Sequence, residues 1–122
     1  MFRMHILLVE DNLMNQKLML RILTKFGYTC DLAVNGKIAT EIYHPDKFHL
    51  ILMDIQMPIM DGITAAKKIL SSFPDAMILA LTANITDENR KQCLSAGMKE
   101  FITKPIAKAE LDELLKTYET LT

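Results

Sequence analysis

The sequence has no tryptophan, only two cysteines, and no apolar run long enough to cross a bilayer. Cys30 and Cys93 are far apart and lack the spacing of a metal-binding motif. We therefore expect two reduced thiols in a cytoplasmic protein. No signal peptide is recognisable, because the first apolar run has the length and composition of a strand. These absences argue against a disulfide scaffold, a zinc module and membrane insertion.

An excess of either charge is also lacking, since 14 basic and 15 acidic residues give a net charge of −1. A balanced chain has no electrostatic reason to bind nucleic acid or an anionic membrane. Hydrophobic residues make up 50% and charged residues 24%, as in ordinary globular proteins. A chain of 122 residues suits one compact core, so we expect a single domain over residues 1–122.

Glycine and proline are few, with four residues each. Short apolar runs alternate with longer amphipathic segments, which predicts strands alternating with helices. Asp61 and Thr86 are expected N-caps, and Gly27 and Gly97 are expected to end helices. We expect strands over residues 5–10, 28–34, 50–54, 77–82 and 100–103, and helices over residues 13–27, 36–44, 62–72, 87–96 and 108–121.

This alternation predicts an α/β fold with a parallel sheet covered by helices on both faces. The strands over 5–10, 50–54 and 77–82 are almost continuously apolar, so we place them in the centre of the sheet. The strand over 28–34 alternates and the one over 100–103 is short and mixed, as expected of edges. With right-handed crossovers, we expect five strands in the order 2-1-3-4-5, a doubly wound, flavodoxin-like arrangement with five helices.

Polar groups stand where four of these strands end. Glu10 and Asp11 follow the first strand, Asp54 ends the third, Thr82 ends the fourth and Lys104 follows the fifth. Ligands of such sheets bind outside the carboxyl ends of the strands, where the strand order reverses. Solvation of strand ends would explain one acid, but it explains poorly three acids, a hydroxyl and a lysine at one edge. The pattern therefore predicts a functional site.

The residue types indicate the chemistry of this site. Three neighbouring carboxylates repel one another unless a cation joins them, and Mg²⁺ or Mn²⁺ prefers such oxygen ligands. Lys104 offers a compact positive charge for a phosphate, and the Thr82 hydroxyl offers a hydrogen bond. A carboxylate can also attack phosphorus to form an aspartyl phosphate. The set therefore favours phosphoryl transfer, which depends on positioning and charge neutralisation.

Four segments carry a family resemblance: "LLVEDN" (7–12), "ILMDIQMPIMDG" (51–62), "LALTAN" (79–84) and "EFITKPI" (100–106). Together they resemble the response-regulator receiver domains of two-component signalling, over essentially the whole chain. The likeness is greatest to the receivers of hybrid sensor histidine kinases. This resemblance implies a cytoplasmic phospho-acceptor that receives its phosphoryl group from a histidine kinase or a histidine-phosphotransfer protein. It implies a signalling domain and not an enzyme.

The resemblance also assigns residues near the phosphate. Asp54 corresponds to the phospho-acceptor, and Glu10, Asp11 and the backbone carbonyl of Gln56 correspond to the ligands of Mg²⁺. In the family these residues support phosphorylation, a conformational switch or onward relay, and slow self-dephosphorylation.

Other assignments concern the switch. Thr82 corresponds to the switch hydroxyl, and Lys104 to the phosphate-binding lysine, whose bond to Pro105 is cis in the family. The aromatic switch position, often tyrosine, is Phe101 here, which has no hydroxyl. Phe101 is therefore either a switch that works by packing alone or a core residue of an edge strand.

Two further surfaces follow from the resemblance. Gln56 and Asn84 occupy the positions that tune the lifetime of the phosphoryl group. The surface of the fourth helix, the fifth strand and the fifth helix is the family's output face, which can also mediate phosphorylation-dependent self-association. Leu13, Lys17 and Leu20 lie off the main apolar face of the first helix and are candidates for docking a partner helix. The alternative is that these are scattered surface residues.

Three other functions remain open. A flavodoxin-like FMN protein would share the strand order, but "VEDNLMNQ" is acidic where a phosphate loop should be rich in glycine and hydroxyls. A small phosphatase with an aspartate nucleophile would favour a second aspartate at the position of Gln56. A scaffold that works without phosphorylation would have no need of the acid, hydroxyl and lysine set.

Overall fold

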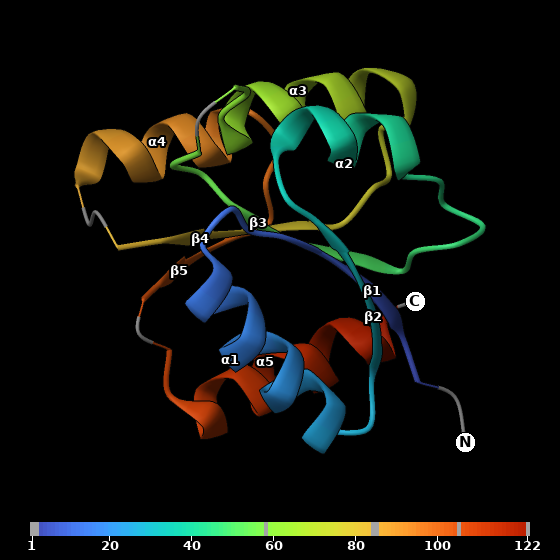
Figure 1. The fold of residues 1–122 in the computed structure, drawn as a ribbon. Coiled ribbons are helices and arrows are strands. Elements are labelled where there is room, and N and C mark those ends of the chain that lie inside the picture. Colours follow the sequence, from blue (N-terminus) through green and yellow to red (C-terminus); the bar gives the residue numbers. More distant parts are fainter. Residues whose placement is uncertain (1–2, 58, 84–85, 105, 122) are drawn as a thin grey trace.

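The computed structural model describes residues 3–57, 59–83, 86–104 and 106–121. Five parallel strands form one sheet in the order β2-β1-β3-β4-β5, which confirms the predicted order (Figure 1). The strands are β1 (His5–Val9), β2 (Thr29–Ala33), β3 (Leu50–Asp54), β4 (Ile78–Thr82) and β5 (Glu100–Thr103). The helices are α1 (Leu13–Lys25), α2 (Gly36–Ile42), α3 (Gly62–Ser72), α4 (Asp87–Ser95) and α5 (Lys108–Thr120).

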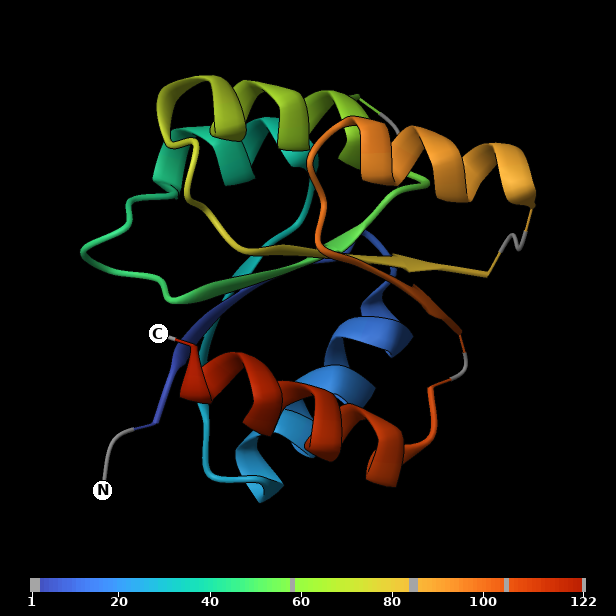
Figure 2. The ribbon, with the colours of Figure 1, turned by 180° about the vertical axis from the view of Figure 1, so that it is seen from behind.

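Helices cover both faces of the sheet, with α2, α3 and α4 on one side and α1 and α5 on the other (Figures 1 and 2). Side chains of a strand point alternately to the two faces, so each central strand serves two cores. In β1, Leu7 packs under the three-helix layer, whereas Ile6 and Leu8 pack against the two-helix layer. We call the core under the three-helix layer the upper core, and the core against the two-helix layer the lower core.

The central strands are buried on both faces, as their apolar runs predict. All residues of β3 and β4 are buried, including Asp54 and Thr82 at their ends. β2 is largely half-buried, as expected of an edge strand. The apolar residues of this segment do not all lie on one buried face. Ala33 lies in the upper core, and Val34, just beyond the end of the strand, is exposed.

Side chains cap the helices that begin near the sheet edge. Asp61 Oδ1 accepts the backbone N–H of Thr64 at 2.8 Å, and Thr86 Oγ1 accepts that of Asn89 at 3.0 Å, so both predicted N-caps are confirmed. Gly97 follows α4 with φ +97°, and a side chain there would meet Leu70 Cδ1 at 2.8 Å. The positive φ is the feature that favours glycine at this turn, because Leu70 Cδ1 is the end of a flexible side chain.

In the first helix, the spacing by four of Leu18, Ile22 and Phe26 predicts one buried face, and the structure differs from this prediction at Leu18. The buried residues of this helix are Gln16, Met19, Ile22 and Leu23, whereas Leu18 is exposed. The spacing of four that links Leu18 to Ile22 is real, but the helix is rotated so that Leu18 lies beyond the buried stripe. Among the described residues, no helix is long and apolar enough to cross a membrane.

Candidate functional site

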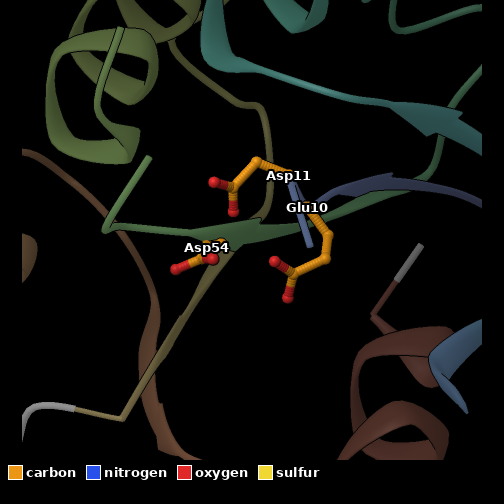
Figure 3. A group of neighbouring side chains, drawn as sticks. All are labelled: Glu10, Asp11 and Asp54. Carbon is orange, nitrogen blue, oxygen red and sulfur yellow. The ribbon is translucent and has the colours of Figure 1, made fainter. Parts of the chain in front are cut away.

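Three carboxylates meet at the carboxyl ends of the central strands. We call this side of the sheet, with Glu10, Asp11 and Asp54, the acidic edge. Glu10 and Asp11 follow β1 and Asp54 is the last residue of β3, and one oxygen of each lies within 4.8 Å of the others (Figure 3). Glu10 and Asp54 are buried, while Asp11 is exposed. Because β1 and β3 are neighbours where the strand order reverses, the parallel sheet itself places these acids together.

Glu10 is held from three directions. Its backbone carbonyl accepts the side-chain amide of Gln16 at 2.8 Å, and its Oε2 accepts the backbone N–H of Asn12 at 3.2 Å. Its Oε1 accepts Lys104 Nζ at 2.6 Å. The start of α1 therefore fixes this buried carboxylate, and Lys104 balances its charge.

Asp54 is equally constrained. Its Oδ1 accepts the backbone N–H of Gln56 at 3.0 Å, and its Oδ2 accepts Lys104 Nζ at 3.3 Å. The backbone of α3 approaches closely, because a side chain at Gly62 would lie 2.3 Å from the carbonyl oxygen of Asp54. Glycine at the first position of α3 thus permits the contact that fixes the end of β3.

Thr82 and Lys104 come from the neighbouring strand ends. The backbone N–H of Lys104 donates to the carbonyl of Thr82 at 2.8 Å, which continues the pairing of β4 with β5 beyond Thr103. Thr82 is buried, and Lys104 reaches across the end of β4 to both acids. The sheet thus brings the hydroxyl-bearing and ammonium-bearing residues to the same edge as the carboxylates.

The electrostatics of this cluster favour a further cation. Burial raises the pKa of Glu10, the Lys104 ammonium partly offsets this effect, and the nearby Asp54 carboxylate adds to it. Burial lowers the pKa of Lys104, but the hydrogen bond to Glu10 and the charges of Asp54 and Glu10 outweigh burial, so the pKa is raised overall. Lys104 contacts two of the three carboxylates, those of Glu10 and Asp54. This all-oxygen donor set, with Asp11 exposed, fits a hard divalent cation such as Mg²⁺.

The structure gathers Glu10, Asp11, Asp54, Thr82 and Lys104 at one edge, as the sequence predicts. The side chain of Gln56 is exposed, and its backbone N–H donates to Asp54 Oδ1. Phe101 is half-buried and packs against the upper core. Two residues of the predicted site, Asn84 and Pro105, lie outside the described residues, and with them the predicted cis bond.

The candidate docking residues separate into two groups. Leu13 and Lys17 are exposed on α1. Leu20 is half-buried and packs against the lower core, so it lies at the border of the buried stripe. Met14 and Leu18 are exposed apolar residues that the sequence analysis did not select.

A cavity of about 320 Å³ lies beside these residues and reaches the site. Leu18, Met19 and Ile22 of α1 line one part of it, and Glu10 and Lys104 line another. Sequence reasoning also missed Asn12 and Gln16 as supports of Glu10. A signal was present, because Gln16 is a polar residue on the same helix face as Met19 and Ile22, one turn after the N-cap residue.

Most of the chain matches known proteins. The profile of the response regulator receiver domain matches residues 6–116. Histidine protein kinase 1 of Candida albicans is 41% identical over 98% of this chain, and the matched region is 5% of that protein's length. The chain thus spans only a small part of the curated relatives that it matches.

Two solved structures share the whole fold. The receiver domain of a sensor histidine kinase from Pseudomonas aeruginosa, which holds a magnesium ion in its active-site cleft, is 35% identical with a TM-score of 0.87, and the match covers 96% of this chain and 98% of that one. A Saccharomyces cerevisiae receiver domain, that of Ssk1 in complex with the histidine phosphotransfer protein Ypd1, is 30% identical with a TM-score of 0.89, covering 98% and 90%. The sequence match, the strand order and the acidic edge agree, and the chain belongs to the family of response regulator receiver domains.

Proposed function

We propose that this domain accepts a phosphoryl group on Asp54 as a step in two-component signalling. One observation carries the proposal: the Asp54 carboxylate is held by the Gln56 N–H and by Lys104 at the end of a buried strand, with the Glu10 and Asp11 carboxylates beside it. A carboxylate with only a structural role has no need of two further carboxylates beside it, because like charges repel. This one lies among groups that neutralise a phosphate and hold a metal.

The proposed reaction moves one phosphoryl group. An oxygen of Asp54 attacks the phosphorus of a partner's phosphohistidine, and a new O–P bond forms as the P–N bond breaks. The electron pair of the broken bond stays on the imidazole nitrogen, which is protonated to give neutral histidine. A water molecule later attacks the phosphorus of the acyl phosphate, which releases inorganic phosphate and restores the Asp54 carboxylate. The domain is thus consumed and regenerated as an acceptor, and is not an enzyme acting on a separate substrate.

Glu10, Asp11 and Asp54, with the backbone carbonyl of Gln56, would hold Mg²⁺ or Mn²⁺, and the ion would supply positive charge against the phosphoryl oxygens. Lys104 would exchange its contact with Asp54 for one with a phosphate oxygen, because its ammonium already lies 3.3 Å from the acceptor carboxylate. The Thr82 hydroxyl would donate to another phosphate oxygen. These are changes of partner within a site that is otherwise already assembled.

We further propose that the partner docks against α1. Leu13, Met14 and Leu18 form an exposed apolar surface with Lys17 beside it, and the adjoining cavity leads to Lys104. An apolar helix face would suit this surface. The yeast complex is support from a relative, since there a histidine phosphotransfer protein is bound to a receiver domain. Leu20 would contribute through the packing of α1 rather than by direct contact.

Two other parts of the proposal rest on the family alone. These are rate tuning by Gln56 and Asn84, and phosphorylation-dependent association through α4, β5 and α5. A single domain over residues 1–122 is proposed because a chain of this length suits one compact core. We also propose a cytoplasmic location, because Cys30 and Cys93 are both free and reduced thiols are typical of that compartment.

A labelling experiment tests the acceptor assignment. The chain is incubated with Mg²⁺ and either a phosphorylated histidine-phosphotransfer protein or acetyl phosphate, and Asp54→Asn is compared with Asp46→Asn, which alters an exposed aspartate remote from the acidic edge. We expect Asp54→Asn to abolish acid-stable labelling at the intact-mass level, while Asp46→Asn retains it. Undiminished labelling of Asp54→Asn would refute the proposal.

A further inference from the structure

Helix α4 is attached to the sheet by few apolar contacts. Its sequence is mostly polar, and Cys93 is its one buried residue. A cavity of about 620 Å³ separates α4 from α3, and polar side chains line it, including Lys67 of α3 and Glu88 and Gln92 of α4. Because so little apolar surface holds α4 in place, any single additional contact has a large share in determining its position.

One such contact joins α4 to β5. The guanidinium carbon of Arg90 lies 5.3 Å from the ring centroid of Phe101, within the range of a cation–π interaction. Phe101 is half-buried against the upper core, so one part of its ring packs inside and another remains available to Arg90. No ion pair involves Arg90 within the described part of the chain, so its charge is not already committed to a described carboxylate.

This contact bridges the two segments that carry the phosphate-facing groups. Arg90 lies on the helix that follows β4 and Thr82, whereas Phe101 lies on β5, which leads to Lys104. In the structure, Lys104 contacts the Glu10 and Asp54 carboxylates. A phosphoryl group on Asp54 would draw Thr82 and Lys104 toward it. Movement of the segment after Thr82 relative to β5 would change the separation of Arg90 and Phe101.

We propose that Arg90 is a positioning residue, which holds Phe101 and α4 in the arrangement described here and thereby opposes the change that accompanies phosphate at Asp54. The inference rests on the proposed function. The contact is suited to this role because a cation–π interaction at an exposed site is weak. It biases the balance between two arrangements by roughly two- to fivefold, and a phosphate with several new hydrogen bonds overcomes it.

The test measures the affinity for beryllofluoride, an anion that mimics a phosphoryl group on a carboxylate, by titration of the intact chain with Mg²⁺ present. We expect Arg90→Gln to bind it about two to five times more tightly than the original chain. Arg90→Lys keeps a cation and should restore most of the original affinity. Lys91→Gln is the matched control, since it removes the same charge from the adjacent exposed position and should not tighten binding.

Two further measurements separate positioning from a general charge effect. The aromatic NMR signals of Phe101 in unligated Arg90→Gln should shift toward their positions in the beryllofluoride-bound original chain. In Phe101→Leu, which removes the ring, Arg90→Gln should have no further effect on affinity. Equal affinities of Arg90→Gln and the original chain would overturn the inference, as would equal tightening by Lys91→Gln. Failure of the original chain to bind beryllofluoride would instead overturn the proposed function, and the inference with it.

Discussion

Helices α1 and α4 both begin beside the acidic edge, but they are attached to the sheet very differently. α1 buries Gln16, Met19, Ile22 and Leu23, and α4 buries only Cys93. α1 also supplies hydrogen bonds to Glu10 from Gln16 and from the backbone of its N-cap residue. The site therefore has a firmly held side at α1, next to the Glu10 and Asp11 carboxylates, and a loosely held side at α4, the helix that comes after Thr82 in the chain.

The largest expected difference concerns packing. Leu23 of α1 is 0% exposed and Leu94 of α4 is 50% exposed. We expect Leu23→Ala to lower the free energy of unfolding by about 2–5 kcal/mol, because it leaves a cavity in the lower core. Leu94→Ala should change it by about 0.5 kcal/mol or less. Urea denaturation of both variants measures this, and similar losses would contradict the view that α4 is loosely attached.

A smaller effect is expected where α1 supports the site. Gln16→Ala removes the buried amide that donates to the Glu10 carbonyl and should lower the free energy of unfolding by about 1–3 kcal/mol. It should also weaken Mg²⁺ binding, because Glu10 is less firmly positioned. Gln92→Ala on exposed α4 is the control, and calorimetric titration with Mg²⁺ reads out the difference. Equal Mg²⁺ affinity in the two variants would show that Gln16 has only a packing role.

Docking of the partner against α1 predicts a change in the rate of phosphotransfer from a protein donor, but not from a small-molecule donor. Leu13→Glu should slow phosphotransfer from a histidine-phosphotransfer protein roughly tenfold, which corresponds to about 1.4 kcal/mol of lost binding. Transfer from acetyl phosphate should be unchanged. Leu13 and Leu121 are each 62% exposed, so Leu121→Glu at the end of α5 is a matched control. If Leu13→Glu slowed both donors equally, α1 would be affecting the chemistry and not the docking.

The smallest effect distinguishes local from global stability. Thr86→Ala removes the hydrogen bond from Asn89 that caps α4, a contact worth about 1 kcal/mol to a helix. Because α4 is loosely attached, we expect faster hydrogen exchange within α4 and a change of less than about 0.5 kcal/mol in global unfolding. Asn12→Ala, which removes the corresponding cap of α1, should lower global stability by about 1 kcal/mol. Equal global losses would show that both helices unfold with the core.

Much of the fold could be predicted because the strands carry unambiguous patterns. The apolar runs of β3 and β4 have no periodicity that could suit a solvent-exposed face, so they had to be central. The caps Asp61 and Thr86 were predictable because they act within one turn of the chain. The boundaries were less secure: the helix expected over residues 36–44 ends at Ile42, since helix ends depend on packing that the local sequence does not contain.

The candidate site was predictable to the extent that it depends on strand order. Once the order 2-1-3-4-5 was inferred, the polar residues at the strand ends had to share one edge, because parallel strands all end on the same side. The orientation of α1 was not predictable in this way. Leu18 and Leu20 are the same residue type, and only the rotation of the helix against the sheet leaves Leu18 exposed and Leu20 half-buried.

Three features could be read from the sequence alone. These are the helices and strands that form, the carboxylate-rich edge where β1 and β3 meet, and the family to which the chain belongs. These features follow from local patterns and from the topology of parallel strands. Three contacts depend on how the elements pack together: Lys104 contacts both Glu10 and Asp54, Gln16 donates to the carbonyl of Glu10, and Arg90 lies over the ring of Phe101. Such contacts join residues far apart in the chain or depend on helix rotation, and their geometry exists only when all the layers are packed together.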